Sequence, residues 1–143
     1  MRIYVASSWK NKRQPEVVKA LRAEGHEVYD FKNSEGFNWR DIDDDWVSWS
    51  PAKYRDMLDH PSAVRGFESD VKAMNWAHAF VLVAPCGRSA HLEFGWAIGT
   101  CLPSFILLEE QQEPELMYRM ADSICLGIPE LVQVLAATEA KGW

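Results

Sequence analysis

Two short runs composed almost entirely of hydrophobic residues constrain the fold of this chain more than any other feature. Residues 79–84 (AFVLVA) and 104–108 (SFILL) are too short for ordinary helices and do not alternate between polar and apolar positions. Such runs are typical of strands that are covered on both faces, as in a parallel sheet. Between them, apolar residues recur at helical spacing over 89–101, which predicts a helix that connects two parallel strands.

The rest of the chain continues this alternation of strands and helices. Short apolar or alternating runs predict three further strands, at 3–6, 26–31 and 123–126. Strands that alternate with helices form a parallel sheet with helices on both faces. We therefore expect an α/β fold with a five-stranded parallel sheet, flavodoxin-like in size, in a single domain over 1–143.

The remaining helices follow from the spacing of apolar residues. One helix is expected to end at Gly25, a second near Ala77, and a third to span 128–137, with a short helix around 115–120. The apolar positions expected to face the sheet are Val17, Val18 and Leu21 in the first helix, Val64, Phe67, Val71 and Met74 in the second, and Leu131, Val134 and Leu135 in the third.

A long segment without periodicity, residues 32–61, interrupts the pattern. It holds three of the seven tryptophans, Trp39, Trp46 and Trp49, among acidic residues, and this aromatic content argues against disorder. We expect a lid or a contact between subunits, with a short helix at 50–58 that Ser50 caps.

Charge and composition exclude several classes of protein. The net charge is −6 and the Lys and Arg residues are scattered, so neither duplex nucleic acid nor a membrane is an expected partner. No apolar run approaches the roughly 18 residues that span a bilayer, and no signal-peptide pattern is present, which favours a cytoplasmic protein. Cys86, Cys101 and Cys125 show no paired spacing, so no disulfide is expected, and the last two are predicted to be buried thiols.

Two loops are the first places to look for a ligand. In open parallel sheets ligands bind beyond the carboxyl ends of the strands, where the strand order reverses, and residues 7–10 and 86–93 follow the first and third strands. Glu93 flanks the apolar stripe in what we predict to be the first turn of its helix, where the helix dipole favours a carboxylate. We expect Glu93 to be ionised and directed into the crevice, and Gly87 to leave room for a ligand.

A second acid favours a catalytic role for Glu93. An acid near a helix start can serve only to complement the dipole, and an acid on a helix surface is usually a solvated charge. Asp70, however, lies at the edge of the apolar face of the helix that leads into the strand before Glu93. Two carboxyl groups on neighbouring elements are what glycosyl transfer requires, one as the nucleophile and the other as the proton donor to the leaving group.

Three stretches of the sequence resemble a known family. RIYVASSW at 2–9, FESDVKAM at 67–74 and SAHLEFGWAIG at 89–99 resemble the nucleoside 2-deoxyribosyltransferase superfamily. This superfamily includes the 2'-deoxynucleoside 5'-phosphate N-hydrolases and has structural cousins among Toll/interleukin-1 receptor (TIR)-like domains that cleave NAD. The resemblance covers about residues 1–10 and 64–108 and carries the same fold as the one expected from the hydrophobic pattern.

The resemblance implies roles for particular residues. It implies that Glu93 is the nucleophile that forms a covalent ribosyl ester, that Asp70 is the acid or base near the nucleobase, and that Tyr4 positions the nucleophile. Ser8 and Lys10 fall where the hydrolase branch has a serine and an arginine that hold the 5'-phosphate. A hydroxyl and an ammonium are chemically reasonable partners for phosphate.

Other residues of the two loops complete the expected substrate site. Arg88 and Ser89, at the start of a helix, offer an anion-binding position, although Arg88 could equally be a surface charge. Trp9 and Trp96 flank the crevice and could contact a base or pack in the core. The expected substrate-binding residues are Ser7, Ser8, Trp9, Lys10, Gly87, Arg88, Ser89 and Trp96.

The chain departs from the transferases in ways that bear on its activity. They have further acids between the third strand and the catalytic Glu, where this chain has CGRS at 86–89, and its tail has no counterpart of an asparagine that they borrow from a neighbouring subunit. We expect N-glycosidic bond cleavage or transfer on a nucleoside or nucleotide, with hydrolysis slightly favoured, no cofactor, and a homo-oligomer. A TIR-like NAD glycohydrolase and a non-catalytic nucleotide-binding or interaction module stay open as alternatives.

Other chemistries fit the residues less well. His78, His91 and Cys86 lack the spacing of a metal site, and His78 is expected at the opposite end of its strand. Cys86 and His91 could form a nucleophilic pair, but nothing in the sequence orients the histidine. The glycines do not form G-x-G-x-x-G, so no Rossmann dinucleotide site is expected. The tryptophans of 32–61 either stack on a base or pack within their own loop.

Overall fold

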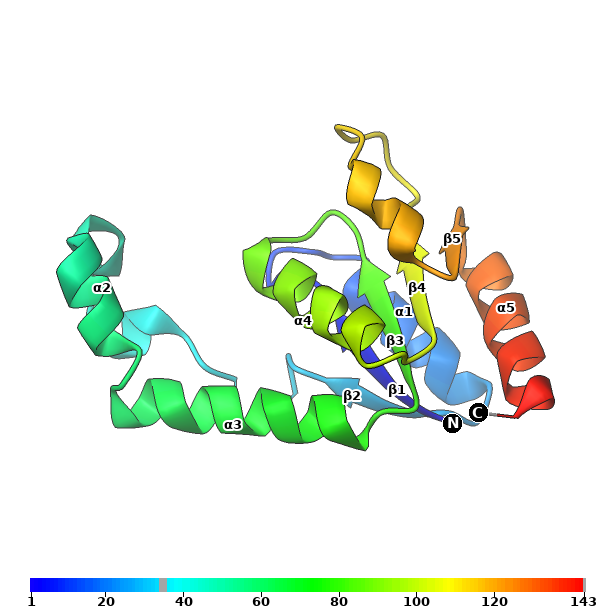
Figure 1. Cartoon of the computed structure of the whole chain (residues 1–143), viewed down its shortest axis with the longest axis horizontal. Helices are drawn as coiled ribbons and strands as arrows, with labels where there is room; N and C mark the ends of the chain where they lie inside the picture. The colour runs from blue at the N-terminus through cyan, green and yellow to red at the C-terminus, as the bar shows by residue number, and fades with distance from the viewer. Residues whose placement is uncertain (34–35, 143) are drawn as a thin grey trace.

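The computed structural model describes residues 1–33 and 36–142 and is built on a five-stranded parallel sheet (Figure 1). This confirms the α/β class predicted from the two apolar runs. The order across the sheet is β2-β1-β3-β4-β5. The strands are β1 (Arg2–Ala6), β2 (Glu27–Asp30), β3 (Ala79–Val83), β4 (Ser104–Leu107) and β5 (Ser123–Cys125), and the helices are α1 (Gln14–Ala23), α2 (Pro51–Met57), α3 (Pro61–Trp76), α4 (Arg88–Gly99) and α5 (Ile128–Lys141), with 3-10 turns η1 (Trp39–Asp41), η2 (Trp46–Ser48) and η3 (Leu116–Met120).

Helices cover both faces of the sheet, and successive residues of each strand serve opposite faces. In β1, Ile3 and Val5 belong to the core beneath α1 and α5, whereas Tyr4 belongs to the core beneath α3 and α4. Successive side chains of a β-strand point to opposite faces of the sheet. We call these the aliphatic face and the aromatic face; Val17, Val18, Leu21, Leu131 and Leu135 pack on the first, and Ala73, Met74, Ala90, Phe94 and Ala97 on the second.

One predicted helix face is wrong in its first half. Met74 of α3 is buried as expected, but Val64 is exposed and Phe67 is 68% exposed. Figure 1 shows the reason: the first half of α3 runs past the edge of the sheet, so only its second half covers the sheet. Helical periodicity in the sequence identifies an apolar stripe but not the point at which the covered surface ends.

Residues 37–61 of the segment predicted to be a lid or subunit contact form, with the start of α3, an arm over residues 37–67 that lies away from the sheet (Figure 1). Phe37 packs on α3 at Gly66, where an added Cβ would approach the Phe37 Cβ to 2.6 Å. Trp39 contacts Trp49 at a ring distance of 5.5 Å. These two tryptophans thus pack within their own loop, and Ser50 caps α2 as predicted. Residues 34 and 35 of the predicted segment 32–61 lie outside the described residues.

The cysteines divide between core and surface. Cys125 is buried, as predicted, but Cys101 is exposed, which corrects the expectation of a buried thiol. The helix α4 ends at Gly99, and Cys101 adopts a left-handed backbone with φ 61°, which turns its side chain outward. No helix within the described residues combines the length and the apolar character needed to cross a membrane.

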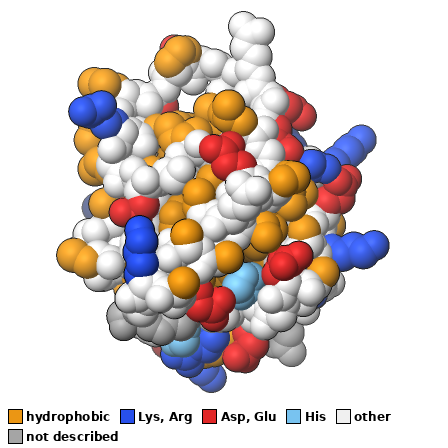
Figure 2. Space-filling view, turned by 90° about the vertical axis from the view of Figure 1, so that its right-hand side faces the viewer, with side chains coloured by type: hydrophobic (Ala, Val, Ile, Leu, Met, Phe, Trp, Pro, Cys, Tyr) orange, Lys and Arg blue, Asp and Glu red, His pale blue; other side chains and the backbone are white. Residues whose placement is uncertain are grey.

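The face that carries α5 and β5 has a mixed surface. In Figure 2, hydrophobic side chains on this face are interspersed with acidic and basic ones, and the Lys and Arg side chains lie apart from one another. This face therefore shows no basic patch among the described side chains. The scattered positive charge agrees with the pattern of the sequence.

Candidate active site

The site lies at the switch point of the sheet, beyond the carboxyl ends of β1 and β3. These two strands pair in parallel, and the chain leaves them in opposite directions, to β2 on one side and to β4 on the other. Hydrogen bonds join the loops that follow them. The Ser7 hydroxyl donates to the Val83 carbonyl at 2.8 Å, and the Asn11 amide donates to the carbonyl oxygens of Val83 at 3.3 Å and Pro85 at 3.1 Å.

Four elements bring two acids and two tyrosines together here. Glu93 comes from α4, Asp70 from α3, Tyr4 from β1 and Tyr29 from β2. The Tyr29 hydroxyl donates to Asp70 Oδ1 at 2.9 Å. The Tyr4 hydroxyl and the Asp70 carboxyl both lie close enough to the Glu93 carboxyl to shift its pKa, Tyr4 downward and Asp70 upward. The structure thus unites the predicted trio of Glu93, Asp70 and Tyr4 and adds Tyr29 to it.

The tyrosines belong to a stack of rings across three strands. Tyr4 lies between Tyr29, at a ring distance of 5.0 Å, and Phe80, at 4.7 Å, with all three rings nearly parallel. The sheet register causes this, because Tyr4 pairs with Tyr29 across β1 and β2 and with Phe80 across β1 and β3. Side chains at paired positions project from the same face of the sheet. The two hydroxyl groups are therefore carried by one rigid platform.

The protonation of Glu93 differs from the sequence-based expectation. Glu93 lies in the second turn of α4, not the first, so the helix dipole acts on it less directly. Burial raises the pKa of Glu93 to about 7, with a further increase from the nearby Asp70 carboxylate, against the hydrogen bond from Tyr4. The carboxyl is therefore partly protonated at neutral pH instead of fully ionised. Burial and the Asp70 charge destabilise the carboxylate more than Tyr4 stabilises it.

Asp70 and Tyr4 are shifted in the same direction. Burial raises the pKa of the Asp70 carboxyl, and the hydrogen bond from Tyr29 opposes that increase. Burial also raises the pKa of Tyr4, helped by the charges of Glu93 and Asp70, so its hydroxyl keeps its proton and acts as a donor. A pair of titratable carboxyl groups with raised pKa values in a crevice is typical of acid and base catalysis.

The first loop offers polar groups at the carboxyl end of β1. The Ser7 hydroxyl is used to hold the loop to β3, and Ser8 Oγ accepts a hydrogen bond from the Lys10 backbone N–H at 3.2 Å. Lys10 is exposed, and so is Trp9, at 52% of its surface. Trp9 lies edge-on to Phe31 at 5.2 Å. Lys10 and Trp9 are therefore accessible from solvent, whereas Ser7 serves the fold.

The second loop leads directly into α4. Gly87 occupies the N-cap position, where no side chain caps the helix, and Arg88 and Ser89 are exposed in the first turn. An uncapped first turn leaves backbone N–H groups free to meet an anion. Trp96, one of the predicted base contacts, is half-buried and packs against the core of the aromatic face.

Cys86 does not have the surroundings of a nucleophile. Its Sγ lies 3.8 Å from His91 Nδ1, but burial and the charge of Glu93 raise the pKa of the Cys86 thiol to about 12. His91 has partners that the sequence did not reveal: Nδ1 lies 2.7 Å from the Gly87 carbonyl oxygen and Nε2 lies 2.9 Å from the Tyr118 hydroxyl. These bonds tie η3 to the loop before α4.

Metal binding has no support in the described part of the chain. Residues 1–33 and 36–142 contain no group of three or more potential ligands placed to hold an ion. His78 lies at the opposite end of β3, as predicted, where its Nε2 accepts a hydrogen bond from Arg2 Nε at 2.9 Å. The histidines thus belong to separate structural contacts.

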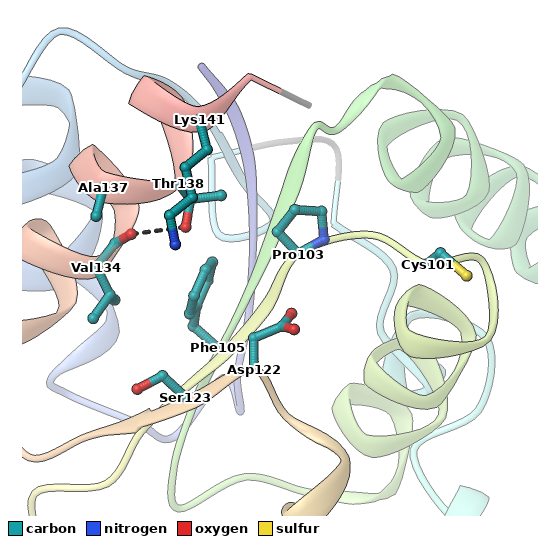
Figure 3. Close-up of a pocket in the computed structure, with 9 residues that line it drawn as sticks. All are labelled: Cys101, Pro103, Phe105, Asp122, Ser123, Val134, Ala137, Thr138 and Lys141. Atoms are coloured by element: carbon teal, nitrogen blue, oxygen red, sulfur yellow. Dashed lines mark hydrogen bonds between the residues drawn. The ribbon is translucent and has the colours of Figure 1, made fainter.

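A hollow in the described surface lies elsewhere. A cavity of about 540 Å³ opens at the amino ends of β4 and β5, beside α5 (Figure 3). Its lining combines Phe105 and Val134 with the polar side chains of Asp122 and Thr138. None of the predicted site residues lines it, so the candidate site is defined by its chemistry and not by the size of its cavity.

Sequence reasoning missed Tyr29 for a specific reason. The alternation of HEVYDF predicted a strand but gave no register, and only the pairing of β1 with β2 places Tyr29 beside Tyr4. A tyrosine near the end of the strand beside the first strand was the available signal. The hydroxyl of Tyr118, which orients His91, had no comparable signal.

Comparison with known proteins identifies the fold. No family model matches the sequence, and no curated protein matches it. Among solved structures, the 2-deoxyribosyltransferase of Bacillus psychrosaccharolyticus is similar at a TM-score of 0.65 and 16% identity, covering 92% of this chain and 90% of that chain. The CMP N-glycosidase of Clostridium botulinum is similar at a TM-score of 0.58 and 18% identity, covering 95% of this chain and 99% of that chain.

Proposed function

We propose that this protein is an enzyme that cleaves or transfers the N-glycosidic bond of a nucleoside or nucleotide, with Glu93 as the nucleophile. The observation that carries the proposal is the convergence of Glu93 and Asp70, from two different helices, on a tyrosine platform at the switch point of the sheet. Two proteins with the same fold, a 2-deoxyribosyltransferase and a CMP N-glycosidase, act on such bonds and support it.

The chemistry requires one proton on the carboxyl pair. An oxygen of ionised Glu93 attacks C1' of the sugar and forms an ester, while the bond from C1' to the base nitrogen breaks and its electron pair leaves with the base. Asp70 supplies the proton that the departing base takes up. Water then attacks C1' and releases Glu93 as a carboxylate, with Asp70 accepting a proton from the water. Attack by a second base in place of water would give transfer.

The two loops supply the groups for the rest of the substrate. Ser8 and Lys10 after β1, and Arg88 and Ser89 at the start of α4, form a polar rim that suits a 5'-phosphate or sugar hydroxyl groups. Gly87 allows the backbone to approach the ligand, and exposed Trp9 offers a ring for the base. Residues 86–89 carry no acid, where transferases of this fold grip their substrate with acids, so hydrolysis is the favoured outcome.

The arm suits contact with a second copy of the chain. Phe67 is 68% exposed, and Val64 and the arm residues Tyr54 and Leu58 are also exposed. A monomer rarely leaves several large apolar side chains of one segment in water. We infer a homo-oligomer that covers them, which light scattering coupled to size-exclusion chromatography would test; a monomer at all concentrations would contradict it.

A base-release screen tests the proposed activity. The protein is incubated with deoxynucleosides, deoxynucleoside monophosphates, ribonucleotides including CMP, and NAD, and free base is quantified by HPLC beside the Glu93→Gln variant. We expect release from one class of nucleoside or nucleotide that the variant abolishes. Release of nicotinamide from NAD alone would indicate an NAD glycohydrolase. Thermal stabilisation by a nucleotide with no product would indicate a binding module and overturn the proposal.

A further inference from the structure

We propose that Tyr29, on the strand next to Tyr4, is a positioning residue for Asp70 and holds the carboxyl group of this acid by a hydrogen bond. The inference concerns the same site and rests on the proposed function for its kinetic consequences. It assigns a role to a residue that neither the motifs nor the pattern of the sequence singled out.

The geometry links Tyr29 to Asp70 in a way that packing alone does not require. The Tyr29 hydroxyl donates to Asp70 Oδ1 at 2.9 Å, which is the normal length of a hydrogen bond to a carboxylate. The Tyr29 ring is held in place because it stacks on the ring of Tyr4, with 5.0 Å between the ring centroids and an angle of 22° between the planes. Tyr4 is only 1% exposed and rests in turn on buried Phe80. Tyr29 therefore presents its hydroxyl from a platform with little freedom to move.

Asp70 needs such a partner more than Glu93 does. Its helix, α3, packs on the sheet beyond Asp70, through Ala73 and Met74, whereas its first half runs past the sheet edge and packs on the arm at Gly66. The bond from Tyr29 connects the acid directly to strand β2. A side chain held by a group on a strand is placed more accurately than one on a helix that packs on the sheet only in part. The tyrosine thus sets the position of the group that must reach the leaving base.

The titratable groups around the pair define what the loss of Tyr29 would do. Asp70 faces Tyr29 from β2, Tyr4 from β1 and Glu93 from α4. The charge of Glu93 also raises the pKa of Cys86, in the loop between β3 and α4. The hydrogen bond from Tyr29 favours the ionised form of Asp70. Without this bond, the coupled pair binds its protons more tightly, so neither of its two macroscopic pKa values can fall and their sum must rise.

The two tyrosines are predicted to differ in one respect. Loss of either hydroxyl moves the pH profile to higher pH, because either loss strengthens proton binding by the pair. Loss of Tyr4 also drives the shared proton onto Glu93, which cannot then attack, whereas loss of Tyr29 drives it onto Asp70, where the reaction needs it. We therefore expect Tyr4→Phe to lose more activity than Tyr29→Phe, although both remove a single oxygen from the same ring stack.

The test compares Tyr29→Phe with wild type by two independent readouts. The first is the titration of Asp70, followed by NMR of its side-chain carboxyl carbon in the full-length protein. The second is the pH dependence of kcat/KM for the substrate found in the base-release screen. We expect the Asp70 midpoint to rise by about one pH unit and the kinetic profile to move in the same direction. The matched control is Tyr54→Phe, in which the changed tyrosine lies in the exposed arm.

A double variant separates positioning from general support of the fold. In an Asp70→Asn background the acid that Tyr29 is proposed to position is gone, so Tyr29→Phe should cause no further loss of kcat/KM. Equal losses in both backgrounds would overturn the proposal, and so would an Asp70 midpoint that Tyr29→Phe leaves unchanged. If the wild type releases no base from any substrate, the proposed function fails, yet the Asp70 titration still decides whether Tyr29 holds this carboxyl.

Discussion

The two faces of the central sheet are built from alternate residues of the same strands, yet they do different work. The aliphatic face takes Ile3 and Val5 from β1 and Val81 from β3, and its buried acid Asp30 accepts a hydrogen bond from the Gln14 side chain of α1 at 2.9 Å. The aromatic face takes Tyr4 from β1 and Phe80 from β3. Its edge carries two acids that its rings help to bury. A shift of one residue along a strand therefore separates a face that stabilises the fold from one that positions reactive groups.

The difference between the faces teaches how the fold divides stability and reactivity. Aliphatic burial stabilises the folded state in proportion to the apolar area removed from water. Burial of Glu93 does the opposite at neutral pH, because the folded state holds its carboxyl away from water and beside Asp70. Changes on the two faces should therefore separate activity from stability.

Glu93→Gln should produce the largest effect on activity. An amide cannot act as a nucleophile toward C1', so we expect kcat/KM to fall by at least about a thousandfold, while the amide oxygen of the new side chain still accepts the bond from Tyr4. The assay is base release by HPLC at saturating and limiting substrate. Circular dichroism controls for folding, and a folded variant with most of its activity would contradict the assignment of the aromatic face.

Asp70→Asn should have the second largest effect. Loss of a general acid lowers rates by about a hundredfold to ten-thousandfold, and the loss should shrink for substrates whose bases leave easily without a proton. Steady-state kinetics on two bases of different basicity measure this. If both substrates lost the same factor, Asp70 would not be the proton donor.

A truncation on the aliphatic face should behave in the opposite manner. Leu131 of α5 is fully buried, so Leu131→Ala should lower the free energy of unfolding by about 2 to 5 kcal/mol. The activity of the folded protein at low temperature should be unchanged. Urea denaturation measures the first effect, and Leu92→Ala, at a position that is 77% exposed, is the control with little expected change. A loss of activity without a loss of stability would break the division between the faces.

The smallest predicted effect is a gain in stability at the active site. Because the folded state raises the pKa of Glu93 from about 4.5 to about 7, it binds the proton more tightly than the unfolded chain does. The stability that Glu93 contributes is therefore complete below about pH 4.5 and is lost as pH rises through about 7. Glu93→Gln should be more stable than wild type by roughly 1 to 3 kcal/mol at pH 8 and equal to it at pH 4. Urea denaturation at the two pH values decides, and a less stable variant at pH 8 would contradict the burial of charge.

The sequence was sufficient for the sheet but not for its edges. Apolar runs such as 79–84 reveal a strand because both faces of that strand are buried, and this property is local. The exposure of Phe67 and Cys101 depends on where α3 passes the sheet edge and on where α4 ends, and neither is a local property of the chain.

In the candidate site, too, the sequence did not predict the features that depend on how the elements pack. Glu93 and Asp70 could be found because their residue types, spacing and family resemblance agree. Tyr29 could not, because its role depends on the register between β1 and β2. The ionised state expected of Glu93 was wrong for a related reason: its pKa is set by burial and by Asp70, which only the folded chain brings near. Residue types predict the chemistry, whereas proton affinities require the packing.

Mass spectrometry of the covalent intermediate tests the role of Glu93 as nucleophile most directly. The protein is mixed with a 2'-fluoro analogue of the substrate found in the screen, which slows both the formation and the hydrolysis of the ester, and is then digested and sequenced. We predict that the sugar is attached to the Glu93 carboxyl and that the adduct is absent from Glu93→Gln. An adduct on another residue, or complete release of base without any adduct, would contradict this role.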